Sequence, residues 1–237
     1  MNGFVAIAAV IGLLLALGMM LGLASRQHFS PRWLLIAALL VLLNDVLLTR
    51  AYGLLPDLIG GAWNWQGKLL ALLACVVVAS LPSFGWKACG LQLAQQRDAL
   101  RAALPVAGLY CAFFLVIALA FPADAADAET MAFQLTMPGI AEEIFYRGTL
   151  LLALDRAFAS RKSLLGVDWG WGALLSCLLF GMDHAFGYSD AGFSFDAITM
   201  AFTALPSFIA VWLRLRTGSL VLPALLHNFG NALPIFL

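Results

Sequence analysis

Long apolar runs separated by short polar segments make up most of the chain. A membrane-spanning helix needs about 20 apolar residues to cross the hydrocarbon core. Eight segments reach or approach this length, and they lie at roughly 4–24, 33–49, 67–84, 104–121, 137–157, 169–187, 197–213 and 217–237. The pattern predicts an all-α fold, a polytopic membrane helix bundle of about eight transmembrane helices. Because no internal repeat or flexible linker separates them, we expect residues 1–237 to form a single transmembrane domain.

Composition agrees with this pattern and excludes two broad classes of protein. Hydrophobic residues make up 63% of the chain and charged residues only 11%, whereas soluble domains carry about 25% charged residues. The formal net charge is zero, without the clustered basic surface that nucleic-acid binding requires. The four cysteines show neither a CxxC pair nor metal-ligand spacing, so we interpret them as small apolar residues.

Tryptophans and basic residues indicate where the spans end and how they are oriented. The seven tryptophans lie almost entirely at proposed span ends, as in an interfacial aromatic belt; they are Trp33, Trp63, Trp65, Trp86, Trp169, Trp171 and Trp212. Alternate loops hold ten basic residues on one side, namely Arg26, Arg32, Lys87, Arg97, Arg101, Arg156, Arg161, Lys162, Arg214 and Arg216. The other side holds only Arg50 and Lys68, with acidic residues that include Asp124 and Glu129. The positive-inside rule therefore predicts that both termini lie outside the cytoplasm.

Three further segments carry predictions of their own. The first apolar run lacks the basic region and cleavage site of a signal peptide, so we expect it to remain as a membrane helix. Residues 85–103 mix apolar and basic positions, which favours a cytoplasmic interfacial helix over a solvated linker. Asn44 and Asp45 form a polar pair near the end of the second span, and we expect Arg50 to neutralise Asp45 there.

The first of three polar clusters within the spans is a pair of glutamates in the sequence PGIAEEIFYRGTLL. Ionisable groups in a membrane cost about 2.5–3.5 kcal/mol each on insertion scales, so each needs a partner, a water-filled cavity or a function. Pro138 marks a helix start, and Glu143 and Arg147 are spaced i,i+4 on one face, where they can neutralise each other. Glu142 points about 100° away and has no local basic partner. We therefore expect chemistry from Glu142 and a structural role from Glu143 and Arg147.

Two later spans carry the other polar clusters. Phe180 and His184 share a helix face near the outer end of the sixth span, and His227 and Asn231 share one in the last span. Each cluster has a plain alternative, because a lone histidine is often hydrogen-bonded inside a core and an amide often joins helices. Together the three clusters supply a carboxylate, two imidazoles and a carboxamide. General-base hydrolysis needs this set, with the carboxylate taking a proton from water and the donors stabilising the oxyanion.

The motifs EExxxR, FxxxH and HxxxN, in this order on successive apolar helices, resemble those of the CPBP (CAAX protease and bacteriocin-processing) family of intramembrane proteases. The family includes the prenyl-protein endopeptidases, and the resemblance covers residues 138–237, while residues 1–121 match in hydrophobicity alone. It implies that Glu142 activates water, His184 positions it, and His227 and Asn231 form the oxyanion site. Glu143, Arg147 and Phe180 would support them. The implied partner is a membrane-associated protein or peptide substrate within the lipid bilayer.

The residues also predict whether the site needs a cofactor and on which side of the membrane it acts. The chain has no HExxH motif, and two histidines with a carboxylate can act on water directly, so we expect no cofactor. A zinc ion held by Glu142, His184 and His227 is the alternative. The loop charges place these three residues in the outer half of the bilayer. Taking the cell to be bacterial, we expect an inner-membrane protein whose active site faces the extracytoplasmic side. A membrane transporter and a catalytically silent, partner-binding family member are the rival functions.

Overall fold

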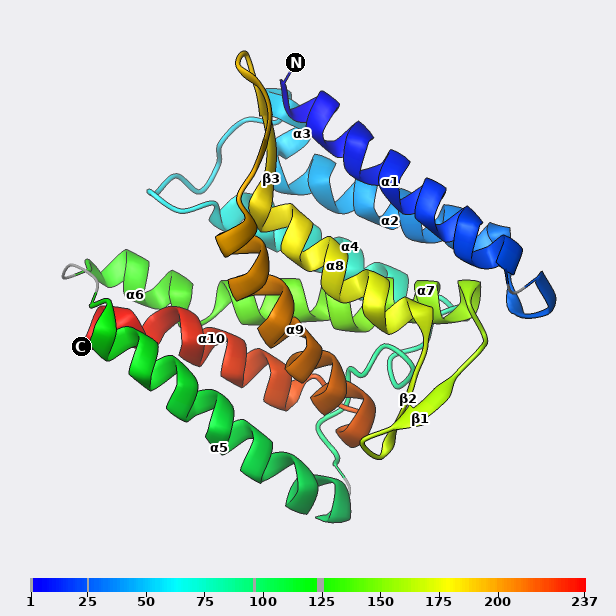
Figure 1. Cartoon of the computed structure of the whole chain (residues 1–237). Coiled ribbons are helices and arrows are strands. Elements are labelled where there is room, and N and C mark those ends of the chain that lie inside the picture. The colour runs from blue at the N-terminus through cyan, green and yellow to red at the C-terminus, as the bar shows by residue number, and fades with distance from the viewer. Residues whose placement is uncertain (1, 25, 96, 123–125) are drawn as a thin grey trace.

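A computed structural model describes residues 2–24, 26–95, 97–122 and 126–237, so Asp124 lies outside the described residues (Figure 1). Most of the described chain is helical. The longer helices are α1 (Asn2–Ala24), α2 (Pro31–Leu48), α4 (Trp65–Ser80), α5 (Arg97–Ala120), α8 (Trp171–Ala185), α9 (Ala197–Thr217) and α10 (Val221–Phe236). The shorter ones are η1 (Arg26–His28), α3 (Arg50–Gly53), α6 (Ala128–Gln134), η2 (Pro138–Glu142), η3 (Ile144–Leu150) and α7 (Leu151–Ala157).

Four of the described helices, α1, α2, α5 and α9, are long and apolar enough to cross a membrane. Two others, α4 and α10, are apolar but have only 16 residues each. The remaining two predicted spans correspond to η2, η3 and α7 in succession and to the 15-residue α8. The helical membrane architecture thus matches the sequence prediction, and the count of eight spans stays a prediction.

Hydrogen bonds between loops show that alternate connections meet at the same end of the bundle. At one end, the Ser30 amide donates to the Ala157 carbonyl, and the Leu220 amide donates to the Gly90 carbonyl. At the other end, the Trp63 amide donates to the Glu129 carboxylate 66 residues away. The chain therefore runs back and forth between two ends, as the alternation of apolar runs predicted.

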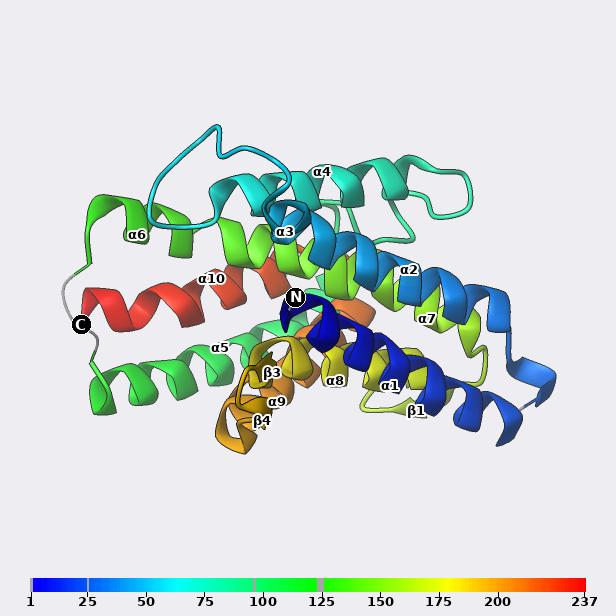
Figure 2. The ribbon, with the colours of Figure 1, turned by 90° about the horizontal axis from the view of Figure 1, so that it is seen from above.

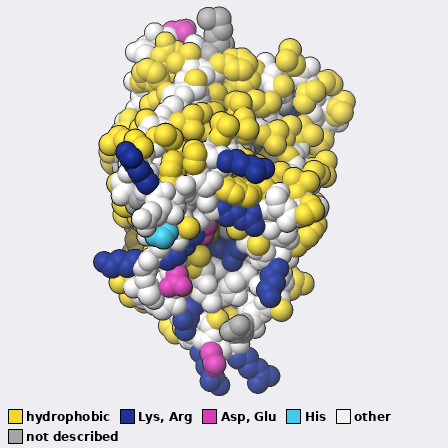
Figure 3. All heavy atoms as spheres, turned by 90° about the vertical axis from the view of Figure 1, so that its right-hand side faces the viewer, with side chains coloured by type: hydrophobic (Ala, Val, Ile, Leu, Met, Phe, Trp, Pro, Cys, Tyr) yellow, Lys and Arg dark blue, Asp and Glu magenta, His cyan; other side chains and the backbone are white. Residues whose placement is uncertain are grey.

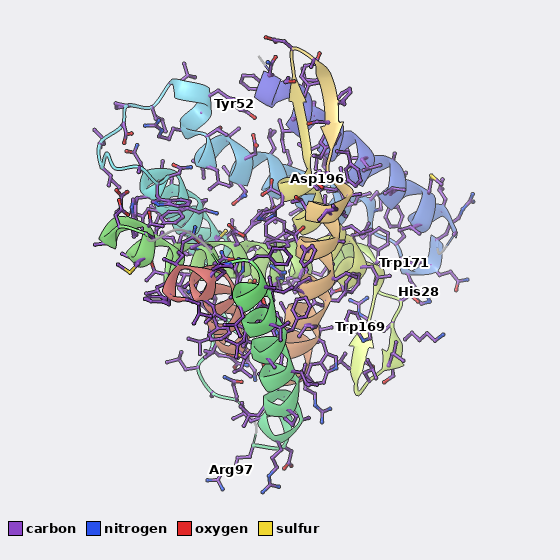
Figure 4. The ribbon with its side chains drawn as sticks, turned by 60° about the vertical axis from the view of Figure 1, so that its left-hand side comes forward. His28, Tyr52, Arg97, Trp169, Trp171 and Asp196 are labelled. Atoms are coloured by element: carbon purple, nitrogen blue, oxygen red, sulfur yellow. The ribbon has the colours of Figure 1, made fainter. Side chains whose placement is uncertain are left out.

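The two ends differ in charge. Figure 3 faces the end that carries η1 and the hairpin after α7, and Lys and Arg side chains gather on its lower half beside an apolar upper half. Figure 4 places Arg97 and Trp169 toward this end, and Tyr52 and Asp196 toward the opposite end. The structure therefore brings together the basic loops from which the sequence analysis inferred orientation.

The segment from η2 to α7 runs through the middle of the bundle. It contacts α2, α4, α8, α9 and α10, and Figure 2 shows α4 on one side of it with α8 and α9 on the other. Its side chains are accordingly buried, including Phe145, Tyr146 and Leu150. Helices that cover this segment on several sides hold its polar residues away from lipid.

Two antiparallel hairpins correct the all-α prediction. The strands β1 (Lys162–Leu164) and β2 (Val167–Trp169) form the first, and β3 (Phe186–Ser189) and β4 (Gly192–Phe195) form the second. Positive φ at Gly166 and Gly192 allows the tight reversals. Both hairpins lie in connections between helices, where strands of three or four residues carry too short an alternation to stand out in an apolar sequence.

Two local predictions were also wrong. Residues 81–95 form turns without an interfacial helix, and the helical part of the segment, from Arg97, is the start of α5. Arg50 does not neutralise Asp45: it pairs with Asp57 at 2.9 Å, and the Tyr52 hydroxyl donates to the Asp45 carboxylate instead. Strained backbone at Arg50, Ala51 and Tyr52, where φ lies between 50° and 57°, turns the chain so that Tyr52 faces back toward α2.

Candidate active site

The segment that carries both glutamates is wound as a π-helix, from Pro138 to Glu142 and from Ile144 to Leu150. Such segments are rare and are often found at functional sites. At its start, the Gly139 amide donates to the Asn228 side chain at 2.7 Å, and a Cβ at Gly139 would lie 2.4 Å from the Ala224 carbonyl oxygen. Glycine therefore lets α10 approach the beginning of this segment closely.

Glu142 lies between a cation on one side and two imidazoles on the other. Lys68 of α4 donates to its Oε1. Its Oε2 lies 3.9 Å from Nε2 of His184 and 3.7 Å from Nε2 of His227. This oxygen is buried and has no hydrogen-bond partner among the described residues. Both distances exceed a direct hydrogen bond, so neither imidazole satisfies this oxygen.

Glu143 makes two supporting contacts, and its spacing from Arg147 predicted one of them. Its side chain is 1% exposed, and its Oε1 accepts from Arg147 at 2.9 Å, as predicted, and from Nδ1 of His227 at 2.8 Å. Arg147 also donates to Ser207 of α9 at 2.7 Å and lies 4.2 Å above the Phe180 ring. Glu143 and Arg147 therefore join the motif segment to α8, α9 and α10.

The hydrogen bonds at Nδ1 determine what each imidazole offers at Nε2. His184 has its Nδ1 2.8 Å from the Phe180 carbonyl oxygen, which can only accept. The Nδ1 of His227 faces the carboxylate of Glu143, which likewise accepts. Both rings thus carry a proton on Nδ1, so in its neutral form each presents an Nε2 lone pair toward Glu142.

A cavity of about 210 Å³ opens beside these residues. Glu143, Arg147, His184, His227 and Asn231 line it, and the rest of its wall is mainly apolar, from α5 and α9. Asn231 is exposed, and His184 is 34% exposed at the side chain. The structure therefore brings together every residue that the sequence analysis proposed for the site, with the Phe180 ring tilted against His184 and edge-on to His227.

The charges of the site balance in a way that the sequence analysis missed. We expected Glu142 to have no basic partner and assigned Lys68 to the membrane interface. Instead, Lys68 pairs with Glu142 and Arg147 pairs with Glu143, so two carboxylates face two cations. The pairing explains how both glutamates can remain inside the bundle.

Lys68, Ser207 and Asn228 are contact residues of the site that sequence reasoning did not find. Asn228 bridges the Gly139 amide and the Thr136 carbonyl, so it performs the helix-joining role that we considered for the amide at Asn231. Asn228 could have been found as the second polar residue of the HNFGN sequence. Lys68 and Ser207 carry no local signal, because their partners lie on helices 74 and 60 residues away.

Residues 124–233 match the family model described as type II CAAX prenyl endopeptidase Rce1-like. The second half of this chain is therefore similar to the CAAX protease family. The matched segment contains all three motifs, so the resemblance noted from EExxxR, FxxxH and HxxxN is confirmed. No curated protein and no solved structure matches the chain.

The family match and the apolar helices together indicate the general character of the protein. The match indicates a CAAX-type protease, a family that acts on membrane-associated protein substrates, and the apolar helices indicate an integral membrane protein. Because the match starts at residue 124, α1, α2, α4 and α5 lie outside it. The first half nevertheless supplies Lys68 to the candidate site.

Proposed function

We propose that this CAAX-family protein is an intramembrane endopeptidase in which Glu142 activates a water molecule to attack a peptide bond. The observation that carries the proposal is the position of Oε2 of Glu142. It is buried, unpartnered among the described residues, and faced by the Nε2 atoms of His184 and His227. A water molecule between these three atoms would donate one proton toward Glu142 and the other to an imidazole. Its oxygen would remain free to attack.

Each residue then has a defined part in hydrolysis. Glu142 takes the water proton while the oxygen bonds to the scissile carbonyl carbon, and the same proton passes to the leaving amine as the carbon–nitrogen bond breaks. His184, with its Nδ1 proton held by the Phe180 carbonyl, accepts from the water and positions it. Lys68 holds Oε1 of Glu142, which leaves Oε2 as the oxygen available to the water.

Stabilisation of the tetrahedral intermediate requires donors, and His227 and Asn231 fill that role. A protonated His227 can donate from both ring nitrogens, from Nδ1 to Glu143 and from Nε2 to the oxyanion. The Glu143 carboxylate accepts from Nδ1 and fixes the orientation of the ring. Asn231 is exposed to the cavity and offers its amide as the second donor. Removing one such donor from an oxyanion site costs about 10²–10³ in turnover.

The residues present do not fit a catalytic zinc ion. Glu142, His184 and His227 have suitable donor atoms, but the described residues contain no group of three such side chains placed to hold a metal. The Lys68 ammonium on the same carboxylate would also repel a divalent cation. We therefore propose metal-free hydrolysis, which requires activity to survive exhaustive chelation. Stoichiometric zinc whose removal and return switch activity off and on would contradict it.

The proposed substrates are proteins anchored in the membrane and cut near their transmembrane segments. The apolar walls of the cavity from α5 and α9 suit such a segment. The positive-inside rule assigns the basic end of the bundle to the cytoplasm and the other end to the extracytoplasmic side. With eight spans, Glu142 follows the extracytoplasmic start of its segment by four residues, or about 6 Å. The site would then serve exported proteins, unlike the prenylated substrates in the family's description.

Comparative proteomics of membranes from cells that express the wild type or Glu142→Gln tests the proposal and identifies the substrate. We expect one or a few proteins to accumulate as uncleaved precursors with Glu142→Gln. Asp98→Asn, on the exposed start of α5, is the matched control and should leave processing unchanged. Identical patterns of cleaved proteins in wild-type and Glu142→Gln membranes would contradict the proposed function.

A further inference from the structure

A second polar cavity, of about 180 Å³, lies between α1, α2, η3 and α8. Its polar lining consists of Asn44, Asp45, Thr49, Tyr52, Tyr146 and Asp183. Among the described residues, no basic side chain pairs with Asp45 or Asp183. Ionisable groups inside a membrane protein are costly unless they are paired or line a water-filled space. Because Asp183 is exposed although α8 packs inside the bundle, the second explanation applies to this cavity.

This cavity and the cavity beside His227 lie on opposite faces of the same wall. From η3, Arg147 lines the first cavity and Tyr146 lines the second. From α8, His184 lines the first and Asp183 the second. No described residue lines both. Asn44 and Asp45 line the second cavity. Arg50, which we expected to neutralise Asp45, pairs with Asp57 instead.

Hydrolysis requires that water reach Glu142 while the substrate is bound. Each peptide bond consumes one water molecule, whose proton passes through Glu142 to the leaving amine and whose hydroxyl stays on the new carboxyl group. A substrate that fills the cavity beside His227 expels the water from it. Glu142 lies four residues before Tyr146, which lines the second cavity, and its Oε2 faces His184, the chain neighbour of Asp183 in that lining. The replacement water therefore needs a path that the substrate does not occupy.

We infer that the cavity lined by Asn44, Asp45, Tyr52, Tyr146 and Asp183 is a water access route, separate from the substrate cavity, that supplies the hydrolytic water to Glu142. The inference rests on the proposed function. Its polar groups offer bound water several hydrogen-bond partners, as a hydrated cavity requires. Tyr52 lies toward the same end of the molecule as Asp196 (Figure 4), so the route runs from the less basic end of the bundle.

Thiol labelling tests the presence of water without depending on catalysis. The starting protein is Cys111→Ser, since the other three cysteines are buried. In lipid vesicles, a small charged methanethiosulfonate should modify Asn44→Cys readily. Leu43→Cys, the exposed neighbour on α2 that lines neither cavity, should react slowly because its thiol faces lipid. Equal, slow reaction of both variants would show a dry cavity and overturn the inference, whether or not the protein cleaves any substrate.

Substrate protection then tests whether the route is separate. The probe is the precursor that accumulates with Glu142→Gln, added to this catalytically blocked variant. It should protect Thr203→Cys in the first cavity from the reagent and leave Asn44→Cys fully reactive. Protection of both cysteines would overturn the separate route while leaving the proposed protease activity intact.

Filling the second cavity tests its contribution to turnover. Ala6 lines the cavity, and Ala8 lies on the exposed face of the same helix. Ala6→Phe should lower kcat several-fold with KM unchanged, because substrate binding is untouched while water supply slows. Ala8→Phe should change neither constant. A normal kcat for a folded Ala6→Phe, or an equal loss in both variants, would contradict the inference.

Discussion

Lys68 and Glu142 form an ion pair between α4 and the motif segment, 74 residues apart in the chain, with 15% of each side chain exposed. The pair joins the half of the chain outside the family match to the half inside it. It also fixes which carboxylate oxygen is free for water. In the proposed mechanism Lys68 is thus a positioning residue, acting on the reaction through Glu142.

Substituting Lys68 should reduce turnover more than binding. We expect Lys68→Met to lower kcat by about 10²-fold, the lower end of what a general base contributes, with little change in KM. Lys68→Arg should recover part of the loss, because a guanidinium can still hold Oε1. Steady-state kinetics on the accumulated precursor measure both. A Lys68→Met variant that is folded and has wild-type kcat would contradict the positioning role.

The loss of a cation beside a buried carboxylate can also unfold the protein, so a double variant is needed. Lys68→Met with Glu142→Gln removes both charges and should recover the thermal stability that Lys68→Met loses. If the double variant is as unstable as the single one, packing of the lysine side chain explains the defect and the ion pair does not.

The Glu143 and Arg147 pair should matter to stability at least as much as to chemistry. Both side chains are almost fully buried, at 1% and 2% exposure. Breaking such a pair strands a charge, so Glu143→Gln and Arg147→Met should each lower the free energy of unfolding by about 3–5 kcal/mol. Denaturant unfolding in detergent measures the loss. A fully stable but inactive Glu143→Gln, beside an active Glu142→Gln, would show that the roles of the two glutamates are reversed.

The contact between Glu129 and residues 62–65, outside the membrane spans, should depend on pH. Hydrogen bonds from the Ala62 and Trp63 amides lower the pKa of Glu129 below its usual 4.5, and its carboxylate also accepts from Trp65 Nε1 at 3.1 Å. A lowered pKa means that this stabilisation is fully present above pH 4.5 and is lost as the pH falls through the lowered value. The protection factors of amides in residues 54–64, corrected for the intrinsic pH dependence of exchange, should therefore fall at acid pH. Glu129→Gln should show the faster exchange at neutral pH, and equal protection in both proteins would contradict the contact.

Local spacing made much of the site predictable. Glu143 and Arg147 lie four residues apart on one segment, and so do Phe180 and His184 and the residues of the HxxxN motif. These relationships survive even where the helix is π-helical. The convergence of the three motifs came from the family resemblance, since nothing in one helix fixes which neighbour it contacts.

The same reasoning could not predict contacts between residues far apart in the sequence. Lys68 lies next to Gly67 and close to Trp65, which is the pattern of an interfacial anchor, and only the packing of α4 against the motif segment turns it toward Glu142. Asp45 has Arg50 five residues away, yet the left-handed turn at Arg50 presents Tyr52 instead. In both cases the sequence pattern predicted one environment for the side chain, and the folded backbone brings it into contact with a different partner.

The gathered basic loops predict the side of the membrane toward which the proposed site opens. A C-terminal alkaline phosphatase fusion expressed in a bacterial host should be active, and a C-terminal green fluorescent protein should be dark, because the C-terminus lies at the less basic end. Fusions at residue 92, in the turns before α5, should give the opposite pair of signals. A bright C-terminal fluorescent protein would turn the site toward the cytoplasm and favour cytosolic substrates.

The central claim is that Glu142, His184 and His227 act as one unit on a water molecule, and cleavage of the accumulated precursor by purified protein tests it most directly. Glu142→Gln, His184→Ala and His227→Ala should each abolish cleavage while remaining folded in detergent. Any double variant should be no worse than the singles, because residues of one catalytic unit are not additive. Asp98→Asn should cleave at the wild-type rate. Partial losses that add up across the three sites, or a folded Glu142→Gln that still cleaves the precursor, would contradict the account.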